Sequence, residues 1–270
     1  MLAPKTRAAI RIGSLLYLVL GLVLFAAPEF SASAFPWRVT SFVAMTLGGW
    51  MLGNGAALWF ASSPGPATRV LPVLAYVAAF AAIELLVVIA FRGALQLGAL
   101  LAIPYLLTLG VSLIAAAFGI LELGTSTDIV VSEDEPLEPL VRRLLLALLV
   151  FVTALAVGGF LAGEGGLSTS GKIFPESLTL FTVRAFGAFY LALAVGIGVL
   201  LLRPGVGSAV ILGIAGIALI VPILVAAVLN IGAFDFAARP LGILYLAAYG
   251  VVLVPSIVFV LRHRETIGRF

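Results

Sequence analysis

The sequence predicts an all-α polytopic membrane protein with eight transmembrane helices, arranged as two parallel four-helix repeats with both termini cytoplasmic. Three observations lead to this fold class: the composition, the length of the apolar runs, and a similarity between the two halves of the chain. Of the 270 residues, 63% are hydrophobic and 10% are charged, and the mean hydropathy is +1.27. Soluble domains carry about a quarter charged residues, so this chain has too little polar surface to remain in water.

Eight apolar runs are long enough to cross a bilayer. A helix needs about 20 apolar residues to span a hydrocarbon core about 30 Å thick. Because a backbone in hydrocarbon must satisfy its own hydrogen bonds, each run is expected to be a helix, and the two-residue alternation of a membrane β-barrel is absent. In chain order the runs cover residues 10–27, 37–61, 67–91, 97–121, 143–162, 177–202, 206–230 and 240–261.

Proline, glycine and charged residues mark the ends of these runs. The first run, with a basic start and small residues at 31–34 after it, imitates a secretory signal peptide. A matching run opens the second half at residue 143, which favours a helix that is retained. The second and third runs follow Phe35-Pro36 and Pro64-Gly65, the third ends before Arg92, and the last four follow Arg142, Glu176, Pro204-Gly205 and Arg239.

The second half of the chain resembles the first at a nearly constant spacing of 139 to 140 residues. Loop landmarks recur at this spacing together with apolar positions, which favours a duplication over chance similarity between apolar helices. Four runs per copy is an even number, so both copies enter the membrane in the same direction and the repeats are parallel, not inverted. The matched positions include Phe35-Pro36 with Phe174-Pro175, Phe42 with Phe181, Gly48 with Gly187, Pro64-Gly65 with Pro204-Gly205, and Tyr105 with Tyr245.

The basic residues indicate the orientation, because cytoplasmic loops of membrane proteins are enriched in lysine and arginine. With a cytoplasmic N-terminus, the inner side receives Lys5, Arg7, Arg11, Arg69, Arg142, Arg143, Arg203, Arg262, Arg264 and Arg269, and the outer side receives Arg38, Arg92, Lys172 and Arg239. We therefore expect a multi-pass protein of the cell membrane with both termini in the cytoplasm. Trp37 and Trp59 then fall near opposite interfaces, as aromatic anchors do.

The only long polar stretch joins the two copies. The domains are expected to be a first four-helix repeat over 1–122, an acidic cytoplasmic linker over 123–140, and a second four-helix repeat over 141–270 with a basic C-terminal tail. A solvated tether is the simplest interpretation of the linker, and docking on a basic partner is the alternative.

Two ionisable residues, Glu84 and Arg184, lie deep within runs. Each is eight residues from a charged residue at the expected outer boundary, Arg92 or Glu176, which places both about 12 Å below that boundary at 1.5 Å per residue. A lone charge at mid-membrane costs about 2.5–3.5 kcal/mol on insertion scales, and pairing offsets that cost. We predict that Glu84 and Arg184 meet between the copies, as a structural ion pair or as a site for a ligand, an ion or a proton. Alone, Arg184 would instead reach lipid phosphates.

The other polar and small residues within the runs point to helix packing. Asn54 is predicted to form a polar contact between helices rather than a contact with a substrate. Gly49 and Gly53 have the GxxxG spacing that permits close helix packing. The residues that match Glu84 and Arg184 in the other copy are uncharged, Leu224 and Met45.

The sequence shows no set of residues for catalysis or for metal binding. It contains no cysteine, and its only histidine, His263, lies in the basic C-terminal tail. Cysteine-based sites and intramembrane histidine ligands to haem or to a transition metal are therefore excluded. The basic residues form no stripe of the kind that binds nucleic acid. We expect no enzyme activity, no metal, no cofactor and no nucleic-acid partner.

Two functions remain open. The first is a non-catalytic accessory or scaffold subunit of a membrane complex that contacts lipid or quinone, because the runs offer few polar groups for a solute pathway. The alternative is a small permease or flippase-like transporter with a polar site at the interface between the repeats. Expected partners are the lipid bilayer, other membrane subunits, and a lipid or another hydrophobic ligand. A cavity reaching Glu84 and Arg184 would favour transport, and tight packing there would favour a subunit.

Overall fold

The computed structural model describes residues 2–66, 69–125, 135–163, 174, 176–237, 240 and 242–267. Within these residues the chain forms helices and loops and no strand. The long helices are α1 (Pro4–Ala26), α3 (Ser41–Ala61), α4 (Leu71–Ala90), α5 (Ala102–Thr125), α6 (Pro139–Leu161), α7 (Leu180–Leu202), α8 (Val206–Leu229) and α9 (Gly242–Arg262). The short elements are α2 (Pro28–Ala34), η2 (Arg92–Ala94), η4 (Ile231–Ala233) and α10 (Arg264–Ile267).

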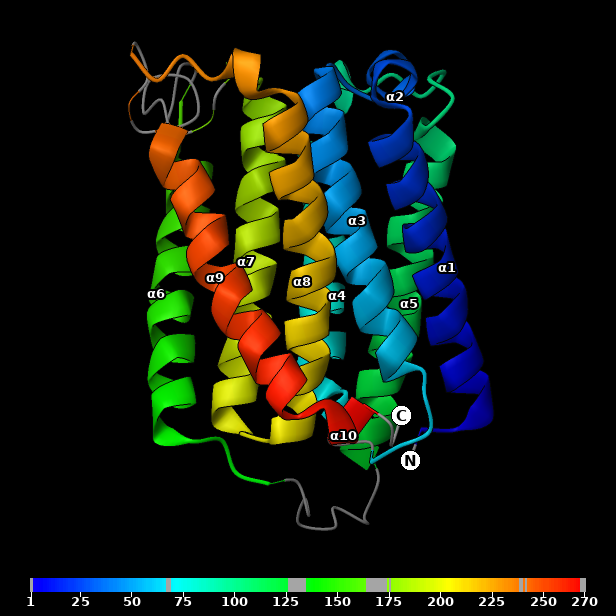
Figure 1. Cartoon of the computed structure of the whole chain (residues 1–270). Helices are drawn as coiled ribbons and strands as arrows, with labels where there is room; N and C mark the ends of the chain where they lie inside the picture. Colours follow the sequence, from blue (N-terminus) through cyan, green and yellow to red (C-terminus); the bar gives the residue numbers. More distant parts are fainter. Residues whose placement is uncertain are drawn as a thin grey trace.

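Seven of the described helices are long and apolar enough to cross a membrane, namely α1 and α4 to α9. The prediction of an all-α multi-pass membrane protein is confirmed in this form. The remaining long helix, α3, has 21 residues and runs beside the others (Figure 1). It carries four glycines and Asn54, which lower its apolar character, and most of its residues are buried. Protein rather than lipid therefore surrounds α3 along most of its length.

Local sequence explains where several helices begin. Thr40 and Thr179 cap α3 and α7, and each hydroxyl oxygen accepts a backbone N–H hydrogen bond of 3.2 Å. Helix α6 begins at Pro139, earlier than the predicted residue 143, because proline is favoured at the first helical positions. Of the predicted linker, residues 126–134 lie outside the described residues.

The long helices run up and down through one bundle (Figure 1). The start of α1 and the short helix α10 lie at one end, which we call the terminal end, and α2 lies at the opposite end, which we call the α2 end. Two exposed side chains connect helices at the terminal end, where an Arg262 nitrogen lies 3.2 Å from a Glu138 oxygen.

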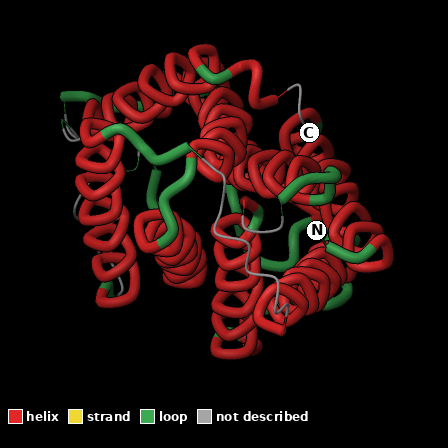
Figure 2. Tube along the Cα trace, turned by 90° about the horizontal axis from the view of Figure 1, so that it is seen from below, coloured by secondary structure: helices red, strands yellow, loops and turns green. Residues whose placement is uncertain are grey.

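Four helices form the contact between the two halves of the chain. Helix α3 packs on α8, and α4 packs on α7. Figure 2 shows the helices of the bundle viewed from the terminal end. Gly49 and Gly53 lie in the contact of α3 with α8, because a Cβ atom on either glycine would come within 2.8 Å of an α8 side chain. Buried rings fill the centre, where Trp50 of α3 stacks on Phe189 of α7 with 4.2 Å between the ring centroids.

The two halves differ in how completely their helices pack. In the first half α1 contacts α3 and α5, and α4 contacts α5, so the four helices close into a bundle. In the second half α6 packs on α7 and α8 packs on α9, but over the described residues no extensive contact joins α6 with α9 or α7 with α8. In their most apolar stretches, 17% of α6 and 11% of α9 is buried, against 39% of α1 and 33% of α5. The second half is two helix pairs rather than a closed bundle.

Candidate functional site

Glu84 lies in the core of the first half, on α4. Its side chain is 1% exposed, and it lies six residues before the end of the helix at Ala90, or about 9 Å along the axis. The Tyr105 hydroxyl on α5 donates a hydrogen bond of 2.7 Å to Glu84 Oε1. The other oxygen, Oε2, is buried and has no hydrogen-bond partner among the described residues. Only one of the two Glu84 carboxyl oxygens therefore has a hydrogen-bond partner among the described residues, which is unusual for a buried carboxyl group.

Further hydroxyl and amide groups continue from Glu84 toward the terminal end. Tyr17 and Ser112 bring their hydroxyls to 3.1 Å between α1 and α5. Asn54 is fully buried on α3 and accepts a hydrogen bond from the Tyr76 hydroxyl of α4 through Oδ1. The Asn54 Nδ2 has no partner in the described part of the chain. Sequence reasoning missed these tyrosines because tyrosine is common in apolar runs.

The segment between α2 and α3 covers this core at the α2 end. The Trp37 ring lies edge-on to Tyr105, with 5.3 Å between centroids, and stacks on Phe181 at 4.1 Å. The backbone N–H of Gln96 donates a 2.7 Å hydrogen bond to the Pro36 carbonyl, which ties the segment to the connection between α4 and α5. Trp37 is only 2% exposed, so protein rather than lipid surrounds its ring.

The same segment also joins the two halves. The Trp37 indole N–H donates a 3.2 Å hydrogen bond to the Thr182 hydroxyl in the first turn of α7. The Thr40 hydroxyl, at the start of α3, likewise donates a hydrogen bond to the Glu176 carboxylate, which precedes α7. Trp37 and Glu176 stand 139 residues apart, as do the capping residues Thr40 and Thr179. Each half therefore contacts the start of a corresponding helix in the other half.

Arg184 has a different partner from the one predicted. Its guanidinium donates a hydrogen bond to the carbonyl oxygen of Gly159 on α6, and no salt bridge joins it to Glu84 in the described structure. Helix α7 begins at Leu180, so Arg184 is four residues, or about 6 Å along the axis, from the end of the helix. The side chain is partly exposed. The structure thus shows Glu84 and Arg184 in separate contacts, one buried and one near the α2 end.

A second group of hydroxyls lies in the second half, and sequence reasoning missed it as a group. Tyr190 of α7 and Tyr249 of α9 bring their hydroxyl oxygens to 3.5 Å. The Tyr245 ring packs on Tyr249 with 5.0 Å between centroids. The match of Tyr105 with Tyr245 in the sequence was the available signal, since Tyr105 contacts Glu84.

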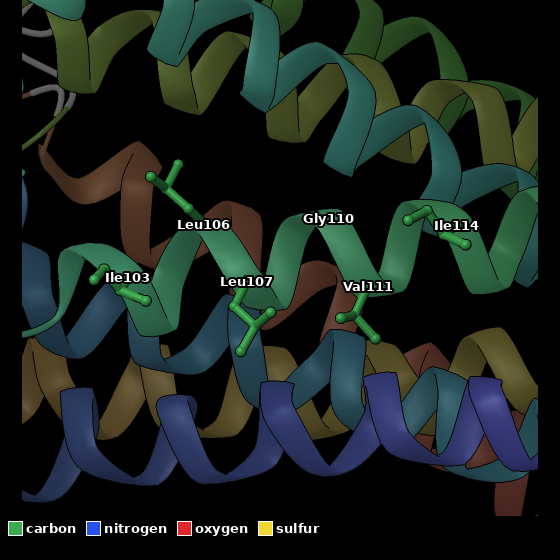
Figure 3. Close-up of a pocket in the computed structure, with 6 residues that line it drawn as sticks. All are labelled: Ile103, Leu106, Leu107, Gly110, Val111 and Ile114. Carbon is green, nitrogen blue, oxygen red and sulfur yellow. The ribbon is translucent and has the colours of Figure 1, made fainter.

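A pocket on the outer surface of the bundle is apolar. A shallow groove on α5 is lined by Ile103, Leu106, Leu107, Gly110, Val111 and Ile114 (Figure 3). All six residues are apolar, as expected of a helix face in contact with lipid acyl chains. No group of three histidine, cysteine, aspartate or glutamate residues comes together as a metal site in the described ranges.

Comparisons with protein-family models, with curated proteins and with solved structures give no match to this chain.

Proposed function

We propose that the chain is a non-catalytic integral membrane subunit, an accessory or scaffold component that contacts lipid or quinone within a larger complex. In this proposal the helices cross the cell membrane eight times as two parallel four-helix repeats, with both termini in the cytoplasm and α3 as the eighth crossing. The observation that carries the subunit role is the unequal packing of the halves. Helices α6 and α9 are far less covered by protein than α1 and α5, and they leave the second half unclosed.

Matched contacts support the two repeats. Phe35 lies edge-on to Tyr105 with 5.4 Å between centroids, and the matched pair Phe174 and Tyr245 has the same arrangement and the same separation. The short helices η2 and η4 follow the third long helix of each half. A duplicated unit is expected to preserve such contacts, and repeats related by an axis along the membrane normal place corresponding helices in corresponding contacts across the interface.

Arg184 suits a lipid-contacting subunit. It lies near the end of α7 and is partly exposed, and the Gly159 carbonyl accepts one hydrogen bond from a guanidinium group that carries five N–H donors. Long basic side chains near helix ends extend to the interface, where lipid phosphates are found. We therefore assign Arg184 to contact with an anionic head group.

Site-specific photo-crosslinking tests the subunit role. A benzophenone amino acid placed at Val251 of α9, which is 71% exposed, is compared with the same probe at Ile103 of α5, which is 70% exposed. We expect Val251 to give a protein adduct in native membranes, and the same protein to co-purify at fixed stoichiometry in mild detergent. Ile103 should give mainly lipid adducts because α5 is already packed against two helices. Lipid adducts alone at both positions, with a chain that purifies without a companion, would refute the subunit role.

The alternative is a small permease or flippase-like transporter, and one observation favours it. Glu84 Oε2 and Asn54 Nδ2 are buried without partners among the described residues, and polar groups in membrane interiors frequently belong to substrate or ion pathways. The pathway would run through the core of the first half. If the purified chain in sealed vesicles moves an ion or a lipid, and Glu84→Gln abolishes that movement without loss of folded protein, the transporter role replaces the subunit role.

A further inference from the structure

The Tyr245 hydroxyl has no hydrogen-bond acceptor in the described structure, whereas Tyr105, the matched residue of the first half, donates to Glu84. Tyr105 donates a hydrogen bond to Glu84 in the first half, but the residue that matches Glu84 in the second half is Leu224. Tyr245 is 5% exposed, and its hydroxyl has no hydrogen-bond partner within the described structure. A buried polar group left without a partner is destabilising, so an acceptor supplied from outside the chain would be bound favourably here.

The groups around Tyr245 are hydrogen-bonding but uncharged. The Tyr249 ring packs on Tyr245, and the Tyr249 hydroxyl lies beside that of Tyr190; phenol groups of this kind carry no charge at neutral pH. The hydroxyl oxygens of Tyr190 and Tyr249 are 3.5 Å apart, at the outer limit of a hydrogen bond. Three phenol groups thus present donors with little competition from protein acceptors.

These phenol groups lie where the second half is least closed. Tyr190 belongs to α7, which pairs with α6, and Tyr245 and Tyr249 belong to α9, which pairs with α8. The two helix pairs make no extensive contact along α6 and α9 or along α7 and α8 over the described ranges. Tyr190 and Tyr249 are only partly buried, so this group of phenol residues reaches the surface of the described structure.

We infer that the second half binds the carbonyl oxygen of a neutral, lipid-soluble molecule, with the Tyr245 hydroxyl as its principal donor. The carbonyl takes the acceptor role that the Glu84 carboxyl group has beside Tyr105. A neutral ligand is favoured because an anion would be desolvated here without a positive partner. Two natural sources carry such a carbonyl, the head group of an isoprenoid quinone and the ester of a glycerolipid. The inference rests on the lipid- or quinone-contacting part of the proposed function.

Binding to the full chain in nanodiscs of an ether-linked phosphatidylcholine tests this inference, because these lipids carry no ester carbonyl. One arm titrates a decyl-substituted benzoquinone and the other titrates dioctanoylglycerol, each labelled with ¹³C at the carbonyl. We expect saturable binding in at least one arm and a lowered carbonyl stretching frequency in the infrared spectrum. Binding of the quinone alone, of the glyceride alone, or of both in competition identifies the source and supports the site.

Tyr245→Phe provides the decisive variant, because it removes only a hydroxyl that has no hydrogen-bond partner in the described structure and should leave the fold at least as stable as before. It is expected to weaken binding about tenfold, the equivalent of one hydrogen bond, and to return the carbonyl frequency to its value in lipid. Tyr17→Phe, which removes a buried hydroxyl from the first half, is the matched control and should bind as the wild type does.

Absence of saturable binding in both arms, or equal affinity and an unshifted carbonyl frequency in Tyr245→Phe, would overturn the inference. The crosslinking test of the subunit role uses the exposed Val251 and does not involve the Tyr245 hydroxyl. Loss of the Val251 adduct with Tyr245-dependent binding retained would therefore reject the subunit role and keep the site.

Discussion

Replacing Gly48 with leucine is expected to lower the free energy of unfolding by about 3 kcal/mol or more, because backbone atoms of α1 occupy the space that the new side chain needs. A Cβ atom at Gly48 would lie 2.9 Å from the backbone nitrogen of Phe25 and 3.0 Å from the carbonyl oxygen of Gly21. Neither atom can rotate away as a side chain can, so α1 must move from α3. Thermal unfolding in detergent micelles, followed by circular dichroism, should show a markedly lower Tm.

Gly110→Leu is the matched control on α5, where a Cβ atom would have no heavy atom within 4 Å. Leucine has a higher helix propensity than glycine by roughly 0.8 kcal/mol, so this variant should be as stable as the wild type or slightly more stable. Gly159→Leu should behave like Gly48→Leu, because its Cβ atom would lie 2.8 Å from Gly187 Cα. Equal stability of the Gly48 and Gly110 variants would contradict the close contact of α1 with α3.

The helices could be predicted well because the signal for them is local. An apolar run of about 20 residues forms a helix in hydrocarbon whatever it packs against, so each predicted run overlaps one long helix of the structure. The predicted positions of the helix ends are less accurate, because each end depends on its own capping residue. Thr179 caps α7 and so delays its start to Leu180, three residues beyond the predicted residue 177.

The separate contacts of Glu84 and Arg184 show what depth along a helix leaves undetermined. A depth counted from Glu176 places Arg184 too far inside the membrane. Helix α7 begins at Leu180, so the arginine is closer to the helix end. Depth also carries no information on the direction in which a side chain projects around the axis. Both residues form hydrogen bonds with uncharged groups, Glu84 with the Tyr105 hydroxyl and Arg184 with the Gly159 carbonyl. A prediction based on complementary charges does not consider such groups.

The difference between the halves could not be predicted from apolar patterns. The runs that become α6 and α9 are as apolar as those that become α1 and α5, with hydropathies of 2.7 and 2.4 against 2.2 and 2.1. Lipid and protein interiors are similarly apolar, so hydropathy does not show which surface a membrane helix contacts. The sequence did contain one usable asymmetry, the replacement of Glu84 by Leu224 at the matched position.

Tyr105→Phe is expected to lower the free energy of unfolding by about 1–3 kcal/mol, because it leaves both carboxyl oxygens of Glu84 without a partner in the core. Glu84→Leu is expected to produce a loss of similar size for the converse reason, since the Tyr105 hydroxyl then has no acceptor. The two losses should not add. In the double variant both polar groups are absent, and apolar replacement of a buried pair is close to neutral or stabilising.

A double-mutant cycle measured by reversible unfolding in mixed micelles therefore gives an interaction energy between Glu84 and Tyr105 of about 1–3 kcal/mol. Tyr17→Phe combined with Glu84→Leu is the comparison cycle, because Tyr17 is buried in the same core but its hydroxyl lies beside Ser112. A much smaller interaction energy is expected there. Additive losses in the first cycle would contradict the hydrogen bond of 2.7 Å. A double variant that is stable yet loses function would show that Glu84 is retained for its chemistry, because the fold does not require it.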